Sequence, residues 1–197
     1  MFKSHFSAIF LVIFLIEYSK SCRTNVVEED PDTVKKAVAV MRGVSGNNTI
    51  QGTVLFEKLQ NGLLEISVNI TGLPKNLGNK HGLHVHQSGI NDFSEDPAIK
   101  CSTAGPHFNP LNSTHGDIKS PVRHVGDYGN VISDQNGNII MKFTDDVSQL
   151  TGPLGIIGRA IVLHENEDDL GLQNNVGSIT FGNSGPRLAC GVIGIVA

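Results

Sequence analysis

Six of the eight histidines in this chain fall at spacings suited to binding metal ions. His84 and His86 lie two residues apart. Residues two apart on a strand project from the same face, so both imidazoles can reach one ion. Taken alone, a His-x-His pair is common among surface histidines, and its significance depends on the other histidines of the chain.

A second group lies further along the chain. His107 stands in the turn-rich segment GPHFNP (105–110), and His115, His124 and Asp127 follow at intervals of eight, nine and three residues. Three imidazoles and one carboxylate form a closed tetrahedral set that suits Zn²⁺. This spacing predicts a structural zinc site.

His164 follows an apolar run, 161–163, at the end of an expected strand. A lone histidine in such a place is more often structural, with its ring nitrogens hydrogen-bonded inside the protein. Only His5 and His81 remain outside the combined set, so six separate structural roles are a poor explanation. We therefore expect a metal-binding protein.

The elements that must position these side chains are strands. Between Leu64 and Ile70, apolar residues alternate with polar ones, which is typical of a half-buried strand. Similar short runs give about eight strands, and Asn136-Gly137 predicts a type I′ hairpin. No helical period of useful length occurs, so we expect an all-β, eight-stranded barrel or sandwich.

Two long segments, 87–123 and 165–187, contain no expected strand. Both are rich in Gly, Pro, Asn, Asp and Ser, and each begins just after a histidine-bearing strand. Long irregular segments in a compact domain are often functional. We expect two functional loops that contribute to the site.

The N-terminal residues 1–21 are typical of a signal peptide, with Lys3 before an apolar run, 6–16. An uncleaved anchor is the alternative, but the run is shorter than the roughly 20 residues that span a bilayer. Residues 22–35 form an expected flexible acidic leader before a domain at 36–197. The mature chain is then secreted and extracellular, with no membrane attachment, and the fate of Cys22 stays open.

Three Asn-x-Ser/Thr triplets are candidate glycosylation sites, at Asn47, Asn69 and Asn112. With a signal peptide, we expect at least one glycan. Asn69 should point outward by the strand alternation.

The formal net charge of −4 and the absence of a Lys/Arg cluster predict no nucleic-acid partner. Because the net charge is negative, chemistry on an anionic substrate would need positively charged side chains concentrated at the site.

Residues 36–197 resemble the copper,zinc superoxide dismutase family over essentially the whole domain. The matching segments are HGLHVH (81–86), GPHFNP (105–110), RHVGDYGNV (123–131), IIGRAIVLHE (156–165) and GNSGPRLACGVIGI (182–195). The resemblance implies an eight-stranded Greek-key barrel with one copper and one zinc per subunit. It also implies conversion of superoxide to O₂ and H₂O₂ as copper cycles between Cu(II) and Cu(I).

The resemblance further implies a role for each matching residue. The copper ligands would be His84, His86, His107 and His164, and the zinc ligands His107, His115, His124 and Asp127. Asp168 would join a copper-ligand and a zinc-ligand histidine. Arg187 would guide superoxide, His107 would also carry a proton, and Cys101 would pair with Cys190.

Two departures from the family pattern matter. The segment 87–100 is longer than in common cytosolic members, and in the family this loop helps to form the dimer interface. A homodimer is therefore expected, with its interface in question.

The loop after His164 has no lysine, and Phe181 stands where a small polar residue is usual. We expect weaker steering of the anion.

Three other functions remain as alternatives. A secreted copper/zinc-binding protein without fast turnover would not need Arg187. A copper chaperone would carry a Cys-x-x-Cys motif, which the sequence does not contain. A copper-only variant is disfavoured because His115, His124 and Asp127 are all present.

Overall fold

The computed structural model describes residues 34–92, 94 and 96–196. The expected signal peptide, Cys22 and most of the expected leader lie outside this part of the chain. Within it, no helix is long and apolar enough to cross a membrane.

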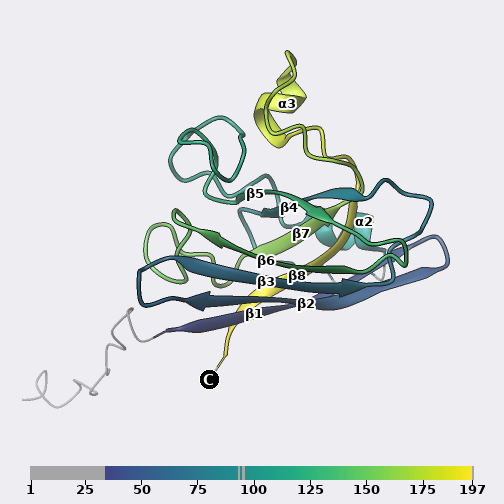
Figure 1. Ribbon diagram of the computed structural model, residues 1–197, viewed down its shortest axis with the longest axis horizontal. Helices are drawn as coiled ribbons and strands as arrows, with labels where there is room; N and C mark the ends of the chain where they lie inside the picture. The colour runs from purple at the N-terminus through teal and green to yellow at the C-terminus, as the bar shows by residue number, and fades with distance from the viewer. Residues whose placement is uncertain (1–33, 93, 95, 197) are drawn as a thin grey trace, which may run out of the picture. The chain divides into compact units, whose positions relative to one another are not determined.

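Eight strands form one antiparallel sheet in the order β5-β4-β7-β8-β1-β2-β3-β6. Their bounds are β1 Lys36–Ser45, β2 Asn48–Lys58, β3 Leu64–Thr71, β4 Lys80–Val85, β5 Asp127–Ile132, β6 Ile139–Asp145, β7 Ala160–His164 and β8 Arg187–Ile195. The sheet folds over so that its two end strands approach each other (Figure 1), and the Ile132 N–H of β5 donates to the Met141 sulfur of β6 at 3.0 Å. The expected eight-stranded Greek-key barrel is confirmed.

Alternation along the strands directs one set of side chains into the barrel. In β3, Leu64, Ile66, Val68 and Ile70 are buried, whereas Asn69 is exposed. The largest fully buried side chains include Phe56, which comes from β2. Burial of such side chains from all parts of the sheet is the main favourable contribution to the stability of the barrel.

The expected type I′ hairpin at Asn136-Gly137 is wrong. β5 pairs with β4 and β6 pairs with β3, so the strands on either side of the turn are not partners. A type I′ turn needs positive φ at both central residues, but here only Gly137 has it, at 78°. The Asp134 carboxylate shapes the turn instead, accepting from the backbone N–H groups of Asn136 and Asn138.

The two long loops lie where they were expected, and each contains one six-residue helix. α2 spans Pro97–Ser102, and α3 spans Val176–Phe181 and projects beyond the strands (Figure 1). Asn175 caps α3 by accepting from the Ser178 N–H, and Gly182 ends it at φ 69°. Six residues are too few to show a helical period, which is why the sequence did not predict these helices.

Candidate metal centre

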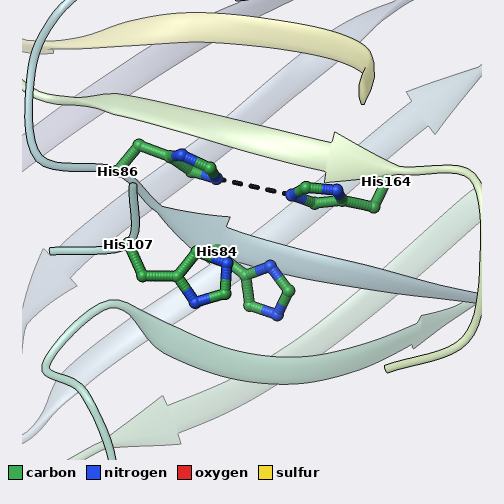
Figure 2. A group of neighbouring side chains, drawn as sticks. All are labelled: His84, His86, His107 and His164. Carbon is green, nitrogen blue, oxygen red and sulfur yellow. Dashed lines mark hydrogen bonds between the residues drawn. The ribbon is translucent and has the colours of Figure 1, made fainter. Parts of the chain in front are cut away.

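Four histidines converge beside β4 and the end of β7 (Figure 2). Each offers a ring nitrogen, and these atoms all lie within 4.8 Å of one another. All four rings are buried, and they come from β4 or its end, from the first long loop and from the end of β7. The residues are His84, His86, His107 and His164.

The strands explain why these rings meet. β4 pairs with β7, where His84 is opposite Val162. The β4–β5 pairing is irregular beside His84, and the β7–β8 pairing is irregular beside His164. Such bulges redirect side chains at sheet ends. His86 lies just after β4 and forms an isolated bridge with His107, which brings the loop histidine to the strands.

Backbone carbonyls orient two of the rings. His86 Nδ1 lies 2.7 Å from the Gly105 oxygen, and His164 Nδ1 lies 3.0 Å from the Gly185 oxygen. A carbonyl can only accept, so in both rings Nδ1 carries the proton. The two Nε2 atoms are then unprotonated, and they lie 3.4 Å apart, where the lone pairs of both could bind the same cation (Figure 2).

The second group surrounds the Asp127 carboxylate. The Nδ1 atoms of three histidines lie within 3.1 Å of its oxygens, at 2.9 Å for His107, 3.0 Å for His115 and 3.1 Å for His124. All four residues are buried. Three nitrogens and one carboxylate oxygen at this spacing make the donor set of a closed tetrahedral site.

His107 belongs to both groups. Its Nδ1 faces Asp127, while its Nε2 is buried and has no hydrogen-bond partner. Burial, and then the neighbouring His84, lower the pKa of His107 to about 3. The ring is therefore neutral at physiological pH, which is the form that can offer a lone pair to a cation.

Asp168 connects the two groups a second time. One carboxylate oxygen lies 2.8 Å from His84 Nε2 and the other lies 2.7 Å from His115 Nε2. Carboxylates placed this way fix the tautomer and orientation of a ligand imidazole. His84 is then left with Nδ1, and that atom is buried without a hydrogen-bond partner.

The two carboxyl groups of this region are ionised before any cation binds. Burial opposes ionisation of Asp127 and Asp168, but hydrogen bonds from histidines hold the pKa of both carboxyls below the usual value. Burial likewise disfavours charge on His115, but its hydrogen bonds with the two carboxylates raise its pKa to about 9. Ionised carboxylates among buried imidazoles attract a cation.

Arg187 lies beside the four-histidine group. It lines a cavity of about 180 Å³ with His86, His107, His164 and Phe181. Its Nη2 donates to the Gly105 oxygen at 2.6 Å, and its Nη1 donates to the Cys101 oxygen. Cys101 forms a disulfide with Cys190, so the segment that carries these carbonyls is tied to β8.

A family model described as copper/zinc superoxide dismutase (SODC) matches residues 50–193. The chain belongs to this family.

Curated relatives agree. The Cu-Zn superoxide dismutase of Schizosaccharomyces pombe is 47% identical over 161 residues, which cover 81% of this chain and 97% of that protein. That of Talaromyces marneffei is 47% identical over 163 residues, covering 82% and 99%. A solved structure, of the clock protein EA4, is 43% identical with a TM-score of 0.72 and covers 83% of this chain and 96% of its own.

As a member of the copper/zinc superoxide dismutase family, the chain is an enzyme with copper and zinc as cofactors and superoxide as substrate. The donors present fit these ions. Imidazole nitrogens suit copper, and a nitrogen–carboxylate set suits zinc. Two buried ring nitrogens also lack hydrogen-bond partners, as expected for atoms that need a cation, at His84 Nδ1 and His107 Nε2.

For this dismutase, the structure brings together every residue that the sequence grouped at the metals, and it forms the expected disulfide. The sequence analysis missed Asn130 and Gly182. The Asn130 amide exchanges hydrogen bonds with the Asp168 backbone, at 2.7 and 2.8 Å. A Cβ on Gly182 would lie 2.0 Å from the Asp168 carboxylate. No local pattern marks either residue, because both act across the fold.

Proposed function

We propose that this chain is a secreted copper,zinc superoxide dismutase in which one histidine is shared by the two metals. One observation supports the shared role most directly. His107 directs Nδ1 into the Asp127 group and leaves Nε2 buried and unpartnered in the four-histidine group. An imidazole that serves two cations must offer both nitrogens in this way.

The proposed ligands follow from the two groups. Copper binds His84, His86, His107 and His164. Zinc binds His107, His115, His124 and Asp127. Asp168 holds one ring of each set in place and does not itself bind a metal, because both of its oxygens contact ring nitrogens that face away from the proposed ions.

Bound copper supplies a one-electron couple, and zinc supplies charge without redox chemistry. Two superoxide ions and two protons give one O₂ and one H₂O₂. Arg187 provides a fixed positive charge where the anion arrives, since two backbone carbonyls hold its guanidinium in the cavity wall. His107 lines the same cavity, and we assign its Nε2, whenever it is not bound to copper, as the atom that would take up a proton from solvent and pass it to the reduced substrate.

The metal and Arg187 roles are tested together. The purified protein, loaded with both metals, should bind one copper and one zinc per chain and dismutate superoxide rapidly. Arg187→Ala should lower kcat/KM by roughly tenfold or more at unchanged metal content. Arg42→Ala is the matched control, because it removes the same charge from an exposed position on β1. Full metal content with negligible turnover would overturn the proposal.

Secretion is supported by the signal-like N-terminus and by features of the domain. The Cys101–Cys190 disulfide suits an oxidising compartment, and the candidate glycosylation sites Asn47, Asn69 and Asn112 are all exposed. Expressed from its full sequence in cultured eukaryotic cells, the protein should appear in the medium with a new N-terminus near residue 22. Replacement of Leu11 by Arg should retain it inside the cells. Equal secretion of both proteins would contradict this proposal.

A homodimer is also proposed. Val40 of β1 and Val192 and Ile195 of β8 are exposed on adjacent strands, and Ile99 of α2 is exposed as well. Light scattering after size exclusion should give twice the chain mass, and Val192→Glu should reduce it to one chain. A wild-type protein that is monomeric at micromolar concentration would exclude the dimer.

A further inference from the structure

A second cavity lies next to the metal centre, and its volume is about 380 Å³. It shares three wall residues with the smaller cavity over Arg187, namely Pro106, His107 and Thr180. Arg187 does not line it. Its cation is Arg159, which comes from the loop just before β7.

Arg159 is held rigidly. Its Nε donates to the Gly155 oxygen at 2.8 Å, and its Nη1 donates to the Gln87 oxygen. Its guanidinium carbon lies 3.6 Å from the centre of the Phe108 ring, so one face of the cation is stacked on an aromatic. A guanidinium fixed at these points loses little further entropy when it binds a ligand.

The charge of Arg159 is not balanced by a carboxylate. Within the described residues, no Asp or Glu oxygen lies within ion-pair distance of Arg159, and Nη2 donates no hydrogen bond. No acidic residue lines the cavity. Partial burial lowers the pKa of the guanidinium, as expected for a cation that is partly removed from water without a counter-ion.

The rest of the lining is complementary to an organic anion. Gln87 is exposed at the wall and offers amide N–H donors. With zinc on Nδ1 of His124, as proposed above, the ring proton is on Nε2, which can donate. The remaining walls include the apolar rings of Pro106, Phe108 and Pro110.

We propose that this cavity binds a small organic carboxylate, with the carboxylate on Arg159 and the apolar body against the two prolines. Arg presents paired donors that match a carboxylate. The two-atom superoxide ion would fill little of this volume, whereas a volume of this size is ordinary for small-molecule sites. The site is therefore distinct from the cavity over Arg187 in both cation and ligand size.

The test is calorimetric titration of the metal-loaded protein with benzoate, with benzamide as the neutral analogue of the same shape. Benzoate should bind and benzamide should not. Arg159→Gln should weaken benzoate binding by roughly tenfold or more, whereas Arg187→Gln should leave it unchanged. No detectable benzoate binding to the wild type would overturn the proposal, and so would loss of binding in Arg187→Gln.

Arg159 donates to two backbone carbonyls, so its loss could also affect folding. Gln87→Glu avoids this problem, because it keeps the arginine and both of its backbone bonds and places a carboxylate on the same wall. This variant should keep the wild-type unfolding temperature within a few degrees and weaken benzoate binding to a similar extent as Arg159→Gln. Unchanged benzoate affinity in a folded Gln87→Glu protein would overturn the proposal.

Discussion

Asp168 contacts one ring in each metal group, and the proposal that it orients both rings without binding an ion has a sharp test. Asp168→Asn keeps the size of the side chain but can accept through only one oxygen, so either His84 or His115 loses its acceptor. We expect affinity for copper and zinc to fall by about 10- to 100-fold, as is usual when such a partner is removed. Competition with a chromophoric chelator measures the affinity.

Glu167→Gln is the matched control. It removes one carboxylate charge from the neighbouring residue, which is exposed and pairs with Lys80 at 2.7 Å. Exposed pairs of this kind contribute little to stability, so metal affinity should not change. If both variants lose affinity equally, the effect is one of net charge and the positioning role of Asp168 is wrong.

The residues that could be predicted from the sequence are those whose chemistry is rare. Few arrangements of six histidines and an aspartate have any other explanation, so their types and spacing were enough to predict a metal-binding set. The four copper ligands were predicted from the resemblance to the family. Asn130 and Gly182 could not be found in this way. Both act by contact with Asp168. The Asn130 contact exists only after the second long loop folds against β5, and the Gly182 contact only after that loop folds on itself.

At the scale of elements, the turn between β5 and β6 depends on one glycine. Gly137 has φ 78°, and a Cβ there would lie 2.1 Å from the Leu73 oxygen. Gly137→Ala should therefore cost both the left-handed backbone penalty and a steric clash. We expect a loss of roughly 2–5 kcal/mol in the free energy of unfolding, measured by urea denaturation.

Gly46 separates these two effects. It also has positive φ, at 58°, but no atom lies within 4 Å of where its Cβ would be. Gly46→Ala should cost only the backbone term, about 1–2 kcal/mol. Equal losses for the two variants would show that the β5–β6 turn relaxes around the added methyl group.

The disulfide ties the first long loop to β8 across 89 residues of sequence. Replacing both cysteines by alanine should reduce the free energy of unfolding by about 2–5 kcal/mol. Because the Cys101 carbonyl accepts from Arg187, kcat/KM should fall as well. Stopped-flow dismutation assays measure the rate. Reductant should slow the wild type and leave the double variant unaffected, and a rate that is insensitive to both changes would contradict the coupling.

Elements could be predicted from the sequence where they repeat a pattern. β3 alternates over eight residues, and this pattern alone identified the strand and the outward direction of Asn69. The type of the turn at Asn136 could not be predicted correctly, because the pairing of the strands depends on the whole sheet and not on the two turn residues. α3 depends on single side-chain caps, which carry little signal in a sequence.

At the scale of the whole molecule, charge sets how fast an anion arrives. The chain has a formal net charge of −4, and the loop 165–187 beside the cavity contains no lysine. Among the residues that line this cavity, Arg187 is the one arginine or lysine, and we expect distant charges to contribute little attraction. We expect kcat/KM to fall only modestly as ionic strength rises from about 0.01 to 0.15 M, where the screening length shortens from about 30 to 8 Å.

Thr180→Lys adds a charge at the wall of the same cavity and provides the comparison. It should raise kcat/KM at low salt and make the dependence on ionic strength steeper. The measurement is the initial rate of superoxide loss by pulse radiolysis. A steep salt dependence in the wild type would mean that charges elsewhere on the surface guide the substrate.

The two metal groups share His107 and are joined again through Asp168, so neither site can rearrange alone. Occupation of one site by its ion orders rings that the other site also needs. The coupling is then a single free energy, and thermodynamics makes it reciprocal. Whatever factor bound zinc adds to the affinity for copper, bound copper must add to the affinity for zinc. Because the first ion orders rings that the second site needs, the second ion should bind more tightly than the first. Protein that holds only one ion should then be the scarcest species in a partial titration.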